Sequence, residues 1–198
     1  MRALVVLISS KYLKRKHMTE TAVFAGGCFW CLEAVFRQVR GVELVVSGYA
    51  GGGDGNAPTY EQVGMGLVHH AEVVQVQFDS EQVSYETLLD VFFTIHDPTT
   101  LNRQGNDVGE QYRSAIYYTS EAQKELAQNT IAALTTSGEF SDPIVTTVEP
   151  LDRFFTAEEY HQNYFEANES KPYCQLVISP KIKKFHQKFG DLLKPEYQ

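Results

Sequence analysis

Cysteine is scarce in this chain, with 3 residues among 198. So small and odd a number does not build the disulfide framework that holds small secreted domains together. It favours a reducing compartment, in which thiols stay free or serve in catalysis. We therefore expect a cytoplasmic protein.

An excess of positive charge and a long apolar run are also missing. The formal net charge of -8 argues against nucleic acid or an anionic membrane as the main partner. The apolar run Ala3–Ile8 is far too short to span a membrane, and its basic cluster (residues 11–16) follows it, whereas a secretory signal carries its charge first. We expect no nucleic-acid partner and no membrane partner.

Linkers, repeats and low-complexity tracts are absent as well, which favours a single domain. We expect residues 1–18 to form a poorly ordered N-terminal extension and residues 19–198 to form the domain. Two glycine-rich loops, 48–56 and 102–112, carry neither a phosphate-binding lysine motif nor a dinucleotide fingerprint. Nucleotide binding is therefore not expected, and both loops are candidates for substrate contacts.

Strands and helices are predicted without strict βαβ alternation. The expected fold is α/β in the broad sense (α+β type), a mixed sheet flanked by helices. The expected strands are 22–25, 42–48, 72–78, 113–118, 144–148 and 175–178. The expected helices are 28–40, 84–95, 120–137, 157–167 and 181–189.

The segment Gly26-Gly27-Cys28-Phe29-Trp30-Cys31 follows a short apolar strand and precedes a helical pattern. This order places Cys28 at a helix N-terminus, where unpaired N–H groups and the helix dipole favour a thiolate, the form that acts as a nucleophile. Cys28 and Cys31 share the apolar stripe of the helix and are expected to point into the protein, whereas Glu33 lies on the opposite face.

Phe29 and Trp30 fall outside that stripe, in the first helical turn. Two large aromatic side chains beside a reactive thiol suit the walls of an apolar substrate pocket. Packing under a neighbouring loop explains them equally well, so the pattern leaves both interpretations open.

These motifs, taken together and in order, resemble the peptide methionine sulfoxide reductase A family. The resemblance covers roughly residues 20–190 and rests on eight blocks: 27–31 (GCFWC), 47–52 (SGYAGG), 58–60 (PTY), 70–72 (HAE), 105–107 (GND), 111–114 (QYRS), 159–162 (EYHQ) and 172–174 (PYC). It implies an enzyme that reduces the S-epimer of methionine sulfoxide, free or in oxidised proteins. That reaction reverses one form of oxidative damage to methionine.

The resemblance also implies roles for individual residues. Cys28 is the nucleophile and becomes a sulfenic acid, while Glu72 is the general acid that protonates the departing oxygen. The hydroxyl groups of Tyr60 and Tyr112 assist at that oxygen. The remaining implied site residues are Phe29 and Trp30 at the substrate's methyl group and Asp107 as an orienting aspartate.

A second cysteine must resolve the sulfenic acid, and two candidates remain open. Cys174 aligns with the family's downstream resolving cysteine, and Cys31 lies on the same helical face as Cys28. Either disulfide is expected to be reduced by an external dithiol, thioredoxin, through thiol–disulfide exchange. The resemblance implies no metal and no bound organic cofactor, and we expect a monomer.

Two other classes of protein compete with this interpretation. One is a general thiol–disulfide oxidoreductase that uses Cys28 and Cys31 alone, which leaves Glu72 unexplained. The other is a zinc-binding module that combines the three cysteines with His69 or His70, although zinc sites usually contain paired motifs with turn-forming flanks.

Overall fold

The computed structural model describes residues 18–53 and 55–198, so the expectation for residues 1–17 lies outside the described residues. Its centre is a six-stranded sheet in the order β7-β6-β1-β3-β2-β8. The strands are β1 (Thr19–Gly26), β2 (Val42–Ala50), β3 (Ala71–Asp79), β6 (Ser114–Tyr118), β7 (Thr147–Pro150) and β8 (Phe154–Thr156). Neighbouring strands are antiparallel except β6 and β7, which are parallel, so the predicted mixed sheet is confirmed.

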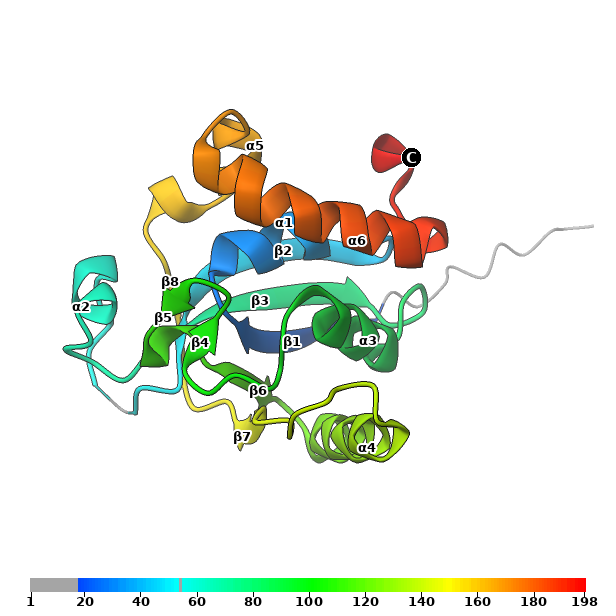
Figure 1. The fold of residues 1–198 in the computed structure, drawn as a ribbon, viewed down its shortest axis with the longest axis horizontal. Coiled ribbons are helices and arrows are strands. Elements are labelled where there is room, and N and C mark those ends of the chain that lie inside the picture. Colours follow the sequence, from blue (N-terminus) through cyan, green and yellow to red (C-terminus); the bar gives the residue numbers. More distant parts are fainter. Residues whose placement is uncertain (1–17, 54) are drawn as a thin grey trace, which may run out of the picture.

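Helices flank this sheet, as predicted (Figure 1). They are α1 (Phe29–Phe36), α2 (Tyr60–Gly64), α3 (Tyr85–Ile95), α4 (Glu121–Ser137), α5 (Tyr164–Asn168) and α6 (Ser179–Phe189). A short hairpin of β4 (Arg103–Gln104) and β5 (Asp107–Val108) stands apart from the main sheet. Helix α1 packs on β2 and β3 and also contacts α5 and α6, so it is enclosed between the sheet and the C-terminal helices.

Both faces of the central strands are buried. Along β1, Ala22 and Phe24 join the large core beneath the helices, whereas Val23 and Ala25 join a smaller cluster on the other face. This explains the continuous apolar run, because a strand covered on both sides shows no polar alternation. β1 is thereby fixed rigidly, and the segment that follows it inherits a defined position.

Two predictions of local structure are wrong. The expected strand 175–178 is part of a helical segment, Cys174–Ile178, with π-helical hydrogen bonding that leads directly into α6. In that segment Cys174 and Ile178 are buried whereas Leu176 is exposed, so the burial follows helical spacing. Short apolar runs do not distinguish helix from strand by periodicity alone.

The expected helix 157–167 is broken into two short pieces. A 3₁₀ turn covers Glu159–His161, and α5 begins after Asn163, whose φ of 53° lies in the left-handed region. The backbone N–H groups of Asn163 and Tyr164 donate to the Glu33 carboxylate at 2.9 and 3.3 Å. The Glu33 side chain, from a helix distant in sequence, thus accepts hydrogen bonds from the backbone N–H groups at the N-terminus of α5. The local sequence does not reveal such a partner.

Candidate active site

Cys28 lies at the junction of β1 and α1. It is the N-cap residue of α1, with φ -60° and ψ 125°, which confirms the predicted position at a helix N-terminus. The preceding Gly27 has φ +88°, and a Cβ atom there would lie 2.5 Å from the side chain of Gln104 in β4. Glycine is therefore required both for the turn and for the close approach of the β4–β5 hairpin.

The two cysteines of the motif are buried together. Cys28 is 6% exposed and Cys31 is 1% exposed, and neither forms a disulfide. Burial raises the pKa of the Cys28 thiol well above its ordinary value, and the neighbouring Cys31 and Glu72 act in the same direction. The hydrogen bond between the two thiols lowers the pKa of Cys31.

The expected thiolate at Cys28 is thus wrong for the site without substrate. The first N–H group of α1, that of Phe29, donates to a carboxylate oxygen of Glu72 at 3.0 Å. This donor is therefore engaged by Glu72, and burial of Cys28 in apolar surroundings outweighs the dipole.

Glu72 is the second residue of β3 and pairs with Tyr49 of β2. It is 2% exposed. Burial raises its pKa to about 8, supported by the charges of Asp107 and Cys31 and opposed by the hydrogen bond from Phe29. A carboxyl group with this pKa is largely protonated at neutral pH and is able to donate a proton.

Three hydroxyl groups surround these residues. Burial raises the pKa of Tyr60 to about 12 and also raises that of Tyr112, and the charges of Glu72 and Cys28 contribute in both cases. Tyr173 donates a hydrogen bond to Asp107 at 2.8 Å and also bonds to Cys28. All three phenols stay protonated at neutral pH and are hydrogen-bond donors.

Tyr173 is a site residue to which the sequence analysis gave no role. It precedes Cys174 in the PYC block, and its position beside a candidate cysteine was the available signal. A cavity of about 480 Å³, lined by Asp107, Tyr173 and Lys181 among others, opens beside it.

The two aromatic residues of the motif differ in their surroundings. Phe29 is 0% exposed and packs against the rings of Tyr49 and Tyr60, with centroid distances of 5.8 and 6.4 Å. Trp30 is half-buried and stacks on Tyr164 at 3.6 Å with an interplanar angle of 6°. The aromatic side chains therefore enclose one edge of the site, and Phe29 also packs beneath the segment that contains Tyr60.

Cys174 is fully buried at the start of the last helical segment. Burial raises the pKa of its thiol, and the charge of Cys31 acts in the same direction. Of the two motif cysteines, Cys31 is thus the electrostatic neighbour of Cys174.

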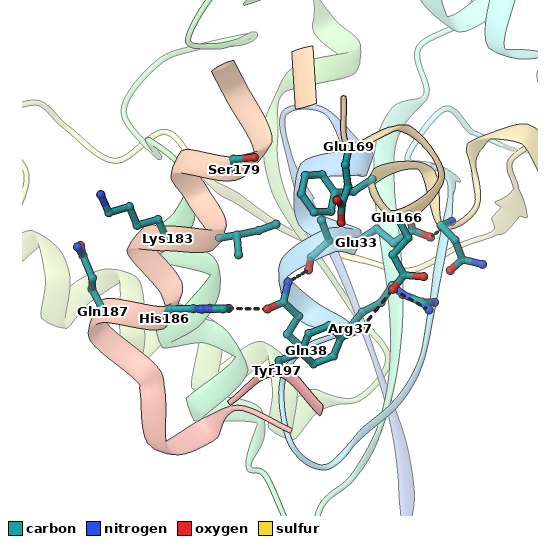
Figure 2. A pocket seen from close by; sticks show the side chains of 14 residues that line it. Glu33, Arg37, Gln38, Glu166, Glu169, Ser179, Lys183, His186, Gln187 and Tyr197 are labelled. Carbon is teal, nitrogen blue, oxygen red and sulfur yellow. Dashed lines mark hydrogen bonds and ion pairs between the residues drawn. The ribbon is translucent and has the colours of Figure 1, made fainter. Parts of the chain in front are cut away.

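The face of α1 opposite Cys28 and Cys31 is covered rather than exposed to solvent. There Glu33 is 1% exposed, and burial raises its pKa while the N–H groups of Asn163 and Tyr164 lower it. A cavity of about 540 Å³ lies along this face, between α1, α5 and α6. Figure 2 shows Gln38, which follows the end of α1, bonded to His186 of α6 there, at 2.6 Å. None of the predicted site residues lines this cavity.

Within residues 18–53 and 55–198, no three His, Cys, Asp or Glu side chains are grouped so that they could hold a metal ion. In the same part of the chain, no helix is long and apolar enough to cross a lipid bilayer.

A buried cysteine at a helix N-terminus, with a protonated carboxyl group and aromatic side chains beside it, is typical of a thiol-dependent enzyme with its own acid. Residues 20–193 match the model of the family described as peptide methionine sulfoxide reductase. The chain belongs to this family, so the family predicted from the motifs is confirmed, together with the oxidoreductase activity on methionine sulfoxide.

Individual relatives agree with this assignment. The peptide methionine sulfoxide reductase MsrA of Acinetobacter baumannii strain AYE is 57% identical over 175 residues, 88% of this chain and 99% of that protein. The reduced form of Mxr1 from Saccharomyces cerevisiae superposes with a TM-score of 0.70 at 34% identity, covering 79% of this chain and 89% of Mxr1. A structure of Mxr1 in complex with Trx2 matches with a TM-score of 0.50 at 28% identity, over 74% of this chain and 84% of that one.

Proposed function

We propose that this chain reduces the S-epimer of methionine sulfoxide, free or within oxidised proteins, with Cys28 as nucleophile and Glu72 as general acid. The observation that carries the proposal is the hydrogen bond from the Phe29 N–H group to the buried Glu72 carboxyl group. It holds the acid at the N-terminus of α1, beside Cys28. The comparisons support the reaction class, and the S-epimer preference follows from the family resemblance.

The reaction transfers one oxygen atom. The Cys28 sulfur attacks the sulfoxide sulfur with an electron pair while Glu72 protonates the sulfoxide oxygen, which forms an S–S bond between enzyme and substrate. The OH group then moves to the Cys28 sulfur as the S–O bond of the substrate and the new S–S bond break, and the substrate sulfur keeps an electron pair. The products are methionine and the Cys28 sulfenic acid, and the proton of the Cys28 thiol restores Glu72. The raised pKa values of both groups support this proton balance, because both enter the cycle protonated.

The surrounding side chains hold the substrate. Tyr60 and Tyr112 donate hydrogen bonds to the sulfoxide oxygen, which becomes more basic as the S–O bond weakens. Phe29 and Trp30 form the recess for the methyl group. Asp107 accepts the hydroxyl proton of Tyr173 and thereby fixes this phenol, whose oxygen is left to accept from the Cys28 thiol.

Cys31 is the first resolving thiol in this proposal. It bonds to Cys28 already in the reduced state. Its sulfur attacks the sulfenic sulfur, which forms a Cys28–Cys31 disulfide and releases water. Cys174, the electrostatic neighbour of Cys31, then attacks the Cys31 sulfur, which frees the Cys28 thiol and leaves a Cys31–Cys174 disulfide.

Thioredoxin reduces this final disulfide, and no metal or bound organic cofactor takes part. The complex of the structural relative Mxr1 with Trx2 supports that partner. A reducing compartment such as the cytoplasm supplies the reductant. One chain contributes all of the residues named here, so the proposed working form is a monomer.

The proposal is tested by methionine release from the separate S and R epimers, with dithiothreitol as reductant. Turnover of the S-epimer alone, lost in Cys28→Ser, is the expected result. Turnover of the R-epimer, or activity retained in Cys28→Ser, contradicts the proposal.

A further inference from the structure

Two residues outside the proposed chemistry lie beside the aromatic side chains of Phe29, Trp30 and Tyr60. Glu158 and His161 follow β8, and His161 is 1% exposed. Its imidazole lies 4.3 Å from the ring of Tyr60, 5.0 Å from that of Phe29 and 5.5 Å from that of Trp30, measured between centroids.

His161 is hydrogen-bonded to the indole of Trp30. The Nε1–H group of Trp30 donates to Nδ1 of His161 at 3.1 Å. An indole nitrogen only donates, so Nδ1 is the acceptor and the imidazole proton resides on Nε2. That Nε2 atom is buried without a hydrogen-bond partner in the described residues and faces Glu158 Oε2 at 3.9 Å.

Glu158 holds the N-terminus of α2. Its Oε1 atom accepts from the backbone N–H of Tyr60, the first residue of α2, at 2.9 Å. Its Oε2 atom accepts from the Tyr49 hydroxyl group at 2.8 Å. The segment 158–161 therefore contacts both α1 and α2, the two elements that supply Trp30 and Tyr60.

The indole of Trp30 is fixed in two directions. Its edge bonds to His161, and its face stacks on Tyr164, whose backbone N–H is held by Glu33. Rotation of the indole toward or away from Tyr60 requires loss of the bond to His161. The position of the Trp30 indole relative to Tyr60 thus depends on residues outside the proposed chemistry.

We propose that His161 and Glu158 are positioning residues that set the width of the methyl-binding recess, and so determine specificity for the methyl over a larger alkyl group on the sulfoxide sulfur. This inference rests on the proposed function, in which Phe29 and Trp30 hold the methyl group. A recess of fixed width discriminates against one added methylene by about 10–200-fold. A recess with a mobile wall discriminates less.

The first test is structural and independent of activity. Trp30 is the single tryptophan of the chain, so a ¹⁵N–¹H spectrum contains one indole Nε1–H signal. His161→Leu should move this signal and speed its exchange with solvent, because leucine cannot accept the bond. His161→Asn, whose side-chain oxygen can take the place of Nδ1, should restore both the position of the indole signal and its slow exchange with solvent.

The second test is kinetic. His161→Leu should raise the KM for methionine sulfoxide about fivefold, as expected for one lost neutral hydrogen bond. It should also lower the ratio of kcat/KM for methionine sulfoxide over ethionine sulfoxide, and His161→Asn should recover most of that ratio. Glu158→Ala should lower the ratio while leaving the indole signal hydrogen-bonded. Glu159 is an exposed carboxylate in the same turn. The matched control, Glu159→Gln, should change neither the kcat/KM ratio nor the indole signal.

An unmoved indole signal in His161→Leu overturns the inference, as does an unchanged methyl-to-ethyl ratio when the signal has moved. If His161→Leu does not fold, a measurable coupling across the Trp30–His161 hydrogen bond in the parent protein and the kinetics of Glu158→Ala decide the question. Failure of the proposed function appears differently, as absence of methionine sulfoxide reduction in the parent protein.

Discussion

The Glu72 carboxyl group accepts a hydrogen bond from the backbone N–H group of Phe29 at 3.0 Å, at the first residue of the helix that Cys28 caps. This contact joins the centre of the sheet to the start of α1. It places an acid with a pKa of about 8 beside a buried thiol. The proposed chemistry requires both members of this pair.

Replacement of the acid should slow the chemical step. In Glu72→Gln the amide oxygen still accepts from Phe29, but no acidic proton is available for the sulfoxide oxygen. The single-turnover rate of methionine release should fall roughly 10²–10⁴-fold. Alkylation of Cys28 by iodoacetamide should persist, and a single-turnover rate equal to that of the parent excludes Glu72 as the acid.

The pH dependence of that rate follows from the raised pKa of Glu72. Because the carboxyl group loses its proton at about pH 8, the rate limited by the acid should decline above this pH. The alkaline decline should be absent from the residual activity of Glu72→Gln. A parent profile that keeps rising through pH 9.5 would contradict the assignment.

Stability should depend on the same group. The pKa of Glu72 is raised from 4.5 to about 8, so between these values the folded state keeps a proton that the unfolded state releases. Stability contributed by the protonated form is complete below pH 4.5 and is lost as the pH rises through 8. Glu72→Gln should therefore raise the melting temperature more at pH 9 than at pH 5, as measured by calorimetry. An equal shift of the melting temperature at pH 9 and at pH 5 is inconsistent with the raised pKa of Glu72.

The order of the cysteines can be determined from disulfide maps. After one equivalent of the S-epimer without reductant, Cys174→Ser should contain a Cys28–Cys31 disulfide and should release one methionine per chain. Its turnover with thioredoxin should be strongly reduced. A Cys28–Cys174 disulfide in Cys31→Ser that forms at the parent rate would assign first resolution to Cys174 instead.

Gly27 should be essential for the turn before Cys28. In Gly27→Ala the added Cβ meets the Gln104 side chain at 2.5 Å and requires φ near +88°. We expect a loss of about 1–3 kcal/mol in the free energy of unfolding, together with lower activity, because β4 carries the hairpin that contains Asp107. Gly66→Ala separates the two effects, since Gly66 has φ +67° with nothing within 4 Å of an added Cβ. If urea denaturation shows equal losses of unfolding free energy in Gly27→Ala and Gly66→Ala, the contact with Gln104 contributes nothing.

Much of the fold and site could be predicted because local signals agreed with tertiary structure. The buried run 22–25, the two glycines and the helical stripe after Cys28 were sufficient to place Cys28 at the N-terminus of α1. Ser84 and Ser120 cap α3 and α4, and serine is a preferred residue at this position.

The remaining features depend on distant partners. The break before α5 arises from the Glu33 carboxylate, more than a hundred positions earlier in the chain. The raised pKa of Cys28 and the roles of His161 and Tyr173 also depend on packing between elements far apart in sequence. Periodicity describes single elements and does not report such contacts.

The most direct measurement of the central claim is mass spectrometry of the Cys31→Ser/Cys174→Ser variant after one turnover of S-methionine sulfoxide without reductant. The account predicts one methionine per chain and the mass of one added oxygen atom on the peptide that contains Cys28. Methionine release without oxygen on that peptide, or oxygen on another residue, would contradict it.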